Sequence, residues 1–193
     1  QNVDYFIANS ENVARRIKKF YRRDATVIYP PVDIPKNESR IRNQESEGSY
    51  YLTGGRLARP KNTDLIVQTF KGLEMPLKIF GRTFAGHDSL FKIHNSNIEF
   101  LGEVTEEGKS ELMRNAKAYI FASEDEDFGI TPVEAMAVGT PVIAYKSGGV
   151  LESVIEQKTG IFFDELTAQS LKNAIERFNN TQFDTEYIVK HAS

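Results

Sequence analysis

The chain has 193 residues, of which 40% are hydrophobic and 26% are charged, a composition typical of a globular domain. Its 24 basic and 27 acidic residues give a net charge of −3, so there is no overall positive field and we predict no nucleic-acid partner. Cysteine is absent, which excludes disulfides, thiolate nucleophiles and cysteine-ligated zinc. No apolar run approaches the roughly 18–20 residues that span a bilayer, so we expect a cytoplasmic protein.

The first part of the chain predicts a small unit followed by a linker. Residues 5–8 predict a strand, and Ser10 predicts the N-cap of a helix over residues 11–22. A second short strand over residues 26–29 ends at Pro30 and Pro31, which prevent regular continuation. The polar run that follows is poor in aliphatic residues. We therefore expect one unit over residues 1–34 and a second over residues 35–193.

From residue 49 onward, apolar runs alternate regularly with helical periodicity. The predicted strands cover residues 50–53, 77–80, 98–101, 118–121, 141–145 and 160–163. The predicted helices cover residues 62–71, 106–115, 131–138, 149–155 and 168–178. Strands separated by such helices favour right-handed βαβ units and a parallel sheet that is covered on both faces. The predicted fold class is therefore α/β, with a Rossmann-like, doubly wound parallel sheet.

Ligands of such sheets bind at the carboxyl ends of the strands, so the loops there carry the functional argument. In the first loop, residues 54–62, Gly55 lets the main chain approach a ligand. Arg56 offers a bidentate fork to phosphate oxygens, and Lys61 adds a point charge. A glycine-rich turn with two solvated basic residues explains this loop equally well, so the neighbouring loops decide between the two interpretations.

Two further loops are expected beside the same ligand. In residues 101–109, the main chain at Val104 is placed to bind a base edge, and Lys109 reaches back from the next helix. In residues 146–149, the paired glycines are expected to let substrate oxygens approach main-chain N–H groups.

The most informative segment is residues 126–134, in which Glu126 and Glu134 flank Phe128 and Gly129. Carboxylates suit a hydroxyl-rich ligand, and the helix start that follows Gly129 suits a phosphate. An acidic surface turn is the alternative reading of residues 124–127. Residues 125–127 also spell Asp-X-Asp, the pattern by which one class of sugar transferases holds a divalent metal. We interpret it as coincidence, because arginine and lysine already neutralise the diphosphate, and we predict no metal and no other cofactor.

Several separated motifs, in the right order, resemble the retaining glycosyltransferases of family 4, which have the GT-B fold. The motifs are Gly55-Arg56-Leu57 with Lys61-Asn62, the Glu126-to-Glu134 spacing, Glu134-Ala135-Met136-Ala137, Gly139-Thr140-Pro141-Val142 and Ser147-Gly148-Gly149 with Glu152. The resemblance extends from about residue 29 almost to the end, and identifies this part with the C-terminal, donor-binding domain of that fold. Residues 4–10 resemble the close of the family's first domain.

The resemblance implies roles for particular residues. Arg56 and Lys61 would hold the diphosphate of a nucleotide sugar, and Glu126 would bind the transferred sugar; these three are the predicted catalytic residues. Glu134 would bind the ribose hydroxyls. The other implied donor-binding residues are Gly55, Val104, Lys109, Phe128, Gly129, Ile130 and Thr131.

The resemblance also implies the partners. The donor would be a GDP- or UDP-linked hexose, with mannose or glucose as our interpretation, and the acceptor a glycan or lipid-linked molecule bound by an N-terminal domain. This chain contains only the tail of that domain, so we expect it not to transfer sugar alone. A basic helix around Arg15 and Arg16 indicates either peripheral membrane contact or, our preferred interpretation, a solvated face.

Other functions stay open as alternatives. A non-catalytic nucleotide-sugar-binding domain would be expected to lose the charged loop residues, which are all present. A nucleotide-sugar epimerase of the same fold would need catalytic groups that we do not locate. A dinucleotide-dependent dehydrogenase would need a G-x-G-x-x-G turn after the first strand of the sheet, and the Gly54-Gly55-Arg56-Leu57 sequence lacks that spacing. His87, His94 and His191 share no metal-ligand spacing.

Overall fold

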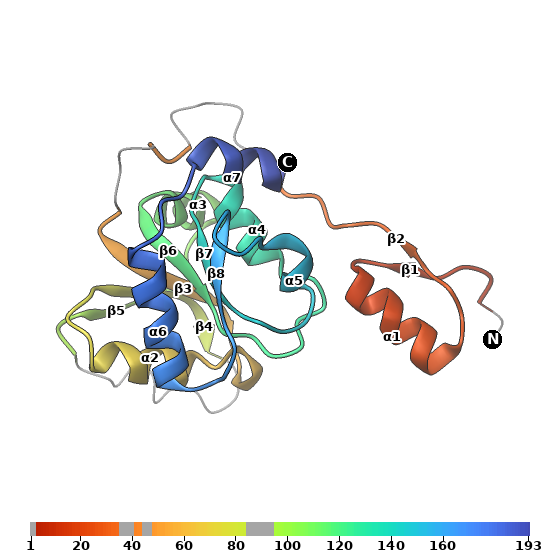
Figure 1. Ribbon diagram of the computed structural model, residues 1–193, viewed down its shortest axis with the longest axis horizontal. Helices are drawn as coiled ribbons and strands as arrows, with labels where there is room; N and C mark the ends of the chain where they lie inside the picture. The colour runs from red at the N-terminus through yellow and green to blue at the C-terminus, as the bar shows by residue number, and fades with distance from the viewer. Residues whose placement is uncertain (1–2, 35–40, 44–47, 84–94) are drawn as a thin grey trace.

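The computed structural model describes residues 3–34, 41–43, 48–83 and 95–193, and its main body is an α/β domain (Figure 1). Six parallel strands form one sheet in the order β5-β4-β3-β6-β7-β8. Their bounds are β3 Tyr50–Leu57, β4 Leu77–Thr83, β5 Ile98–Gly102, β6 Ala116–Phe121, β7 Val142–Tyr145 and β8 Gly160–Phe163. The order runs outward from β3 and then reverses to β6, which is the doubly wound topology that the sequence predicts.

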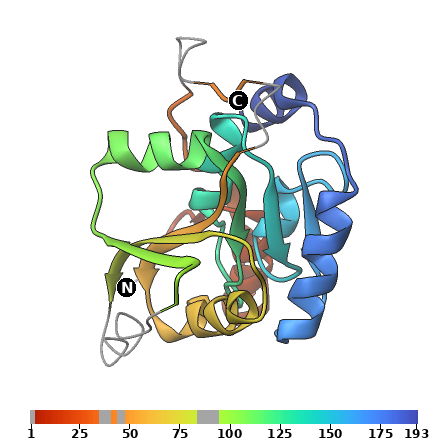
Figure 2. The ribbon, with the colours of Figure 1, turned by 90° about the vertical axis from the view of Figure 1, so that its left-hand side faces the viewer.

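Helices cover both faces of this sheet (Figure 2). On one face lie α2 Thr63–Lys71 and α6 Ala168–Asn179. On the other face lie α3 Glu106–Arg114, α4 Ile130–Ala137, α5 Val150–Ser153 and α7 Thr185–Ala192. Successive residues of a strand point to opposite faces, so Tyr51 enters the core beneath α2 and α6, while Leu52 enters the core beneath α4. Both faces are thus buried, as expected for a parallel sheet.

The N-terminal segment stands apart from the six-stranded sheet. Strands β1 Ile7–Ala8 and β2 Thr26–Val27 pair in parallel with each other, and α1 Glu11–Tyr21 connects them. Within this described segment α1 buries none of its residues, and Tyr5 and Phe20 are 88% and 71% exposed. Figure 1 shows the segment beside α5. Among the described residues, every helix is too short or too polar to span a bilayer.

Several elements differ from the sequence predictions, among them β3, α5 and α7. Strand β3 does not end at Thr53 but continues through Gly54, Gly55 and Arg56, because these residues pair with β4 in register. Gly55 and Gly81 face each other with φ angles of 111° and 117°, a conformation that glycine adopts without strain. The predicted helix over residues 149–155 is limited to α5. Helix α7, which we did not predict, begins after the N-cap Asp184 and buries Ile188 against the core.

Candidate functional site

A cavity of about 210 Å³ lies where the strand order reverses, between the carboxyl ends of β3 and β6. This is the position at which open α/β sheets bind their ligands. Its walls come from β3, from the segment before α2, from β6 with the loop after it, and from the first turn of α4. The lining residues are Thr53, Gly54, Gly55, Arg56, Lys61, Thr63, Tyr119, Ile120, Phe121, Ala122, Ser123, Glu126, Ile130 and Thr131.

Lys61 and Glu126 form an ion pair in this cavity. Their side chains are 30% and 28% exposed, so both remain within reach of solvent and of a ligand. The Ser123 hydroxyl donates to the same carboxylate oxygen, Glu126 Oε2, over 2.8 Å. Lys61 Nζ also lies 5.3 Å from the centre of the Phe121 ring. The structure therefore brings together a predicted diphosphate-binding cation and the predicted sugar-binding acid.

Arg56 occupies the same cavity from the end of β3, where its side chain is exposed. The short 3-10 helix Arg59–Lys61 then turns the chain back over the cavity. Asn62 fixes this turn, because its left-handed backbone (φ 48°) begins α2 and its side-chain amide donates to Ala122 O over 2.9 Å. The two predicted cations thus reach the cavity from a segment that is hydrogen-bonded across to the end of β6.

Tyr119 supports the floor of the cavity. Its side chain is buried, its hydroxyl donates to Gly54 O over 2.9 Å, and it is also hydrogen-bonded to the Thr131 side chain. Burial is the main cause that raises the pKa of Tyr119, so the phenol stays protonated. The Tyr119 side chain therefore joins Gly54 of β3 to the first turn of α4.

The first turn of α4 lines the cavity through Ile130 and Thr131. Gly129 precedes the helix with a left-handed φ of 82°, and among the described residues no side chain caps this helix start. The main-chain N–H groups of Ile130 and Thr131 begin the helix, and the positive end of the helix dipole favours an anion there. Phe128 is buried before the turn, in the same core as Phe121.

Glu134 and Lys109 pair with each other beside the cavity, whose described wall includes neither of them. Lys109 Nζ lies 3.0 Å from Glu134 Oε1 and 2.6 Å from Glu106 Oε2. The burial of Lys109 acts to lower its pKa, but the hydrogen bonds to Glu106 and Glu134 and the charges of these two carboxylates together outweigh burial, and the pKa is raised. Val104, before α3, packs against the core of that face. Of the two carboxylates, Glu126 lines the described cavity and Glu134 does not.

One surrounding feature differs from what we expected. The N–H of Gly149 is not available to a substrate, because it donates to Glu126 O over 2.8 Å. Gly148, with φ 72°, lies so close to Glu126 that a side chain there would meet its main chain. The loop over residues 146–149 thus supports the Glu126 loop. The Asp-X-Asp carboxylates also have a partner, because Arg16 contacts both Asp125 and Asp127.

No group of three histidine or acidic side chains gathers as a metal site in the part of the chain that the structure describes. His191 Nε2 is hydrogen-bonded to Ser153 O over 2.7 Å, and its ring stacks on Tyr187. His87 and His94 lie outside the described residues.

Sequence reasoning missed two contributors to this site, Tyr119 and Ser123, and named Glu152 only as part of a family motif, without a role. In the sequence Tyr119 is indistinguishable from the apolar strand residues beside it. Its role depends on the hydrogen bond from its hydroxyl to Gly54 O, which only the fold brings within reach. The position of Ser123, directly after β6 at the carboxyl edge of the sheet, is a signal that could have found it. Glu152 acts on a segment 141 positions away, which no local pattern reveals.

Comparison with known proteins decides the family. Residues 35–192 match the family model described as glycosyl transferases group 1. The chain belongs to this family. The match covers the whole six-stranded sheet and all of the cavity-lining residues. The predicted resemblance to family 4 glycosyltransferases is confirmed.

Curated relatives of this glycosyl transferase group 1 chain include mannosyltransferases. The chain is 27% identical to an uncharacterized glycosyltransferase of Methanocaldococcus jannaschii, over 94% of this chain and 51% of the relative. It is 36% identical to alpha-1,3/1,6-mannosyltransferase ALG2 of Dictyostelium discoideum, over 95% of this chain and 54% of the relative. The chain thus spans about half the length of the curated relatives it matches.

Solved glycosyltransferase structures share the fold. The lipopolysaccharide outer core galactosyltransferase WaaB superposes with a TM-score of 0.79 at 18% identity, covering 98% of this chain and 57% of WaaB. HepE from Anabaena, in complex with UDP and glucose, superposes with a TM-score of 0.74 at 24% identity, covering 99% of this chain and 56% of HepE. The fold is that of the C-terminal half of GT-B glycosyltransferases, as predicted.

Proposed function

We propose that this chain is the donor-binding half of a retaining glycosyltransferase that transfers a hexose from a nucleoside-diphosphate sugar. The observation that carries the proposal is the convergence of Arg56, Lys61 and Glu126 on one cavity at the point where the strand order reverses. Cations there suit a diphosphate, and a carboxylate suits sugar hydroxyls. The uncapped start of α4 adds main-chain donors on the same side.

Each side chain has a chemical task in this proposal. Arg56 and Lys61 neutralise the charge that develops on the diphosphate as the bond to the sugar breaks, and such preorganised groups can each contribute about 10²–10³ in rate. Glu126 orients the sugar through its hydroxyls, and the acceptor attacks from the face that the diphosphate leaves. The first turn of α4, from Ile130, contacts the phosphate.

The remaining donor contacts place the nucleoside along the carboxyl edge of the sheet. Glu134 binds the ribose hydroxyls, and Lys109, which contacts Glu134, holds that carboxylate in position. Val104 offers its main chain to the base. Gly55 leaves the space above β3 open, since nothing lies within 4 Å of where its side chain would begin.

The donor is GDP- or UDP-linked mannose or glucose in this proposal, and the acceptor is a glycan or a lipid-linked molecule. Mannosyltransferases among the relatives support mannose, and the UDP bound in HepE supports uracil as the alternative base. The reaction takes place in the cytoplasm. Peripheral contact with a membrane through α1 suits a lipid-linked acceptor, since its basic side chains include Arg15 and Lys19.

A second domain supplies the acceptor site in this proposal. Residues 1–34 form the end of that domain and the crossing into the donor-binding domain over residues 35–193. The exposed apolar side chains of the N-terminal segment, including Tyr5 and Phe20, support this division, because a two-stranded parallel sheet with an unburied helix is not stable alone. The half-length match to the relatives supports it as well.

Calorimetric titration of the chain with GDP, UDP, ADP and their sugar conjugates tests the proposal. We expect one nucleoside diphosphate and its sugar conjugate to bind. In a parallel thermal-shift assay, the same diphosphate should raise the melting temperature and NAD should leave it unchanged. A ligand at a hundred times its dissociation constant stabilises by about 2.7 kcal/mol, which a thermal shift resolves. An acceptor panel tests the second half of the proposal, because transfer by these 193 residues alone would contradict it. Absence of binding by every nucleotide would refute donor binding itself.

A further inference from the structure

Helix α1 is docked on the loop that carries Glu126, although the two are far apart in sequence. The buried Ser10, which is the N-cap of α1, donates its hydroxyl to Asp127 O over 2.5 Å. The side-chain amide of Asn12 donates to Glu126 O over 3.3 Å. On its other side, the same Glu126 carbonyl accepts from the N–H of Gly149 over 2.8 Å. The main chain of Glu126 is therefore held between α1 and the loop before α5.

Arg16 of α1 contacts the two aspartates that flank Glu126. Its guanidinium donates to Asp127 Oδ1 over 2.8 Å and to Asp125 O over 3.2 Å, and it lies 3.8 Å from Asp125 Oδ1. The two aspartates thus point toward α1. Glu126, between them, points the other way and pairs with Lys61 in the cavity. Of these three consecutive carboxylates, Glu126 therefore faces the cavity, and Asp125 and Asp127 contact α1.

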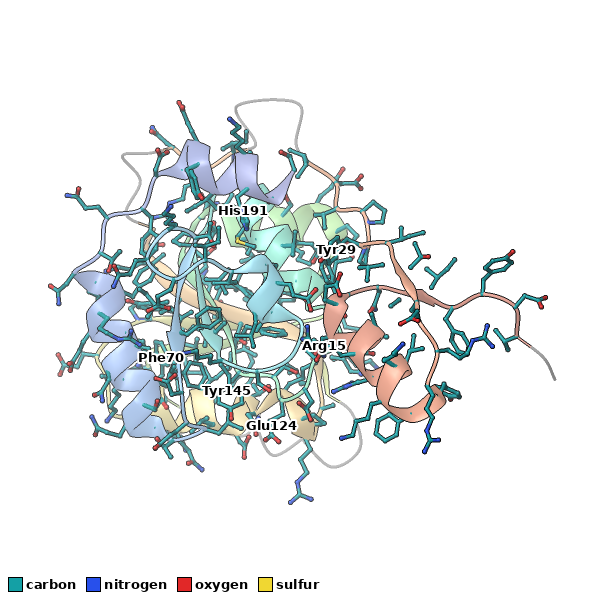
Figure 3. The ribbon with its side chains drawn as sticks, turned by 45° about the vertical axis from the view of Figure 1, so that its right-hand side comes forward. Arg15, Tyr29, Phe70, Glu124, Tyr145 and His191 are labelled. Atoms are coloured by element: carbon teal, nitrogen blue, oxygen red, sulfur yellow. The ribbon has the colours of Figure 1, made fainter. Side chains whose placement is uncertain are left out.

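Glu152 completes the contact by holding the start of α1. Its carboxylate accepts from the N–H of Glu11 over 2.8 Å and from the N–H of Asn12 over 2.7 Å, which satisfies two donors that a helix start leaves unpaired. The Tyr29 hydroxyl donates to the same carboxylate over 3.2 Å, and the Tyr29 ring lies 5.6 Å from that of Phe128. Figure 3 shows Tyr29 where the N-terminal segment meets the domain.

We propose that Glu152 and α1 form a clamp that positions Glu126 for the sugar of the donor. The clamp consists of Ser10, Asn12 and Arg16 on the helix and of Glu152 on the domain. This inference rests on the proposed function, because it takes Glu126 as the sugar-binding acid. None of the clamp residues lines the cavity, so they are positioning residues rather than catalytic ones. A shift of the N-terminal segment is thereby transmitted to the carboxylate that orients the sugar.

The test measures the ratio of the affinity for a sugar nucleotide to the affinity for the bare nucleoside diphosphate. The two pairs compared are UDP-glucose with UDP and GDP-mannose with GDP. We expect E152Q and R16Q each to lower this ratio by about tenfold, because each loses charge-assisted hydrogen bonds. The affinity for the bare diphosphate should be kept or raised, because Arg56 and Lys61 remain in place. K18Q is the matched control: Lys18 lies on the same helix but pairs with Asp24, so its ratio should not change.

Hydrogen exchange provides a readout that needs no ligand. The Gly149 amide, which donates to Glu126 O, should lose protection in E152Q and R16Q while the free energy of global unfolding is unchanged. Unchanged protection of the Gly149 amide would overturn the clamp. The clamp would also be overturned if E126Q lowers the ratio of sugar-nucleotide to diphosphate affinity but E152Q and R16Q both leave it unchanged. An R16K variant should recover part of the ratio, since it restores the charge. If E126Q itself leaves the ratio unchanged, or if wild type binds no nucleotide, the proposed function fails and the inference fails with it.

Discussion

The Lys61–Glu126 pair gives a prediction in which the effect on binding and the effect on stability separate clearly. Replacing Lys61 by methionine keeps the length of the side chain and its contact with the Phe121 ring, but removes the charge. Glu126 keeps the hydrogen bond from Ser123, so the variant does not leave the carboxylate without a partner.

The structure sets the two magnitudes. Both members of the pair are about 30% exposed, so the loss of the pair should cost only about 1 kcal/mol of the free energy of unfolding. A charge-assisted contact to a diphosphate contributes about 1.5–3 kcal/mol, so the dissociation constant for UDP or GDP should rise roughly 10- to 150-fold. E126Q should act in the opposite direction. It removes the anion that competes for Lys61, and should tighten binding of the bare diphosphate by roughly fivefold.

Isothermal titration calorimetry and urea unfolding of the same preparations measure both quantities. K146M is a suitable control, because Lys146 follows β7 at the same edge of the sheet but pairs with Asp164 outside the cavity. Its dissociation constant should lie within about twofold of wild type. A K61M variant that binds the diphosphate as tightly as K146M, at unchanged stability, would refute the assignment of Lys61.

Three predictions concern the framework around the site. Y119F leaves Gly54 O without its buried donor, and should lower the free energy of unfolding by about 1–3 kcal/mol in urea titrations, with the more exposed Y187F near wild type. Burial raises the pKa of Tyr50 and of Tyr51 from 10 to about 12, so above pH 10 the folded state keeps protons that the unfolded chain releases. This contribution to the free energy of unfolding is full below pH 10 and falls toward pH 12 by on the order of 2 kcal/mol per tyrosine. Y50F and Y51F should each make the free energy of unfolding depend less on pH in this range. G148A forces a methyl group against the main chain of Glu126 at φ 72° and should cost about 1–3 kcal/mol or more. A methyl group at Gly72 comes close to the flexible end of Lys172 and lies at an ordinary contact distance from Thr69 O, so G72A should change stability little; equal effects of the two would contradict this geometry.

Much of the fold follows from the sequence because a doubly wound sheet leaves a strong local signal. Strands buried on both faces read as short apolar runs, and β6, β7 and β8 fall where such runs predict them. The carboxyl ends of parallel strands share one edge, which is why the loop after β3 and the loop after β6 could be expected to meet. Arg56, Lys61 and Glu126 do line one cavity, while their roles stay predictions.

The differences arise where tertiary pairing overrides local preference. Gly54, Gly55 and Arg56 carry little strand propensity, yet they continue β3 because β4 offers a ladder in register. Helix α7 has a mixed polar and apolar sequence, and the burial of Thr185 and Ile188 against the domain explains its place. The clamp between Glu152 and α1 depends on a contact over 141 positions, so no spacing in the sequence indicates it.

The most direct test of the account is a crystal structure of the chain with the nucleoside diphosphate that binds most tightly. We predict that the pyrophosphate lies in the cavity between β3 and α4, within hydrogen-bond distance of Arg56 and Lys61, with Lys61 turned from Glu126 toward the phosphate. A nucleotide bound elsewhere on the molecule, or one whose phosphates contact neither cation, would contradict it.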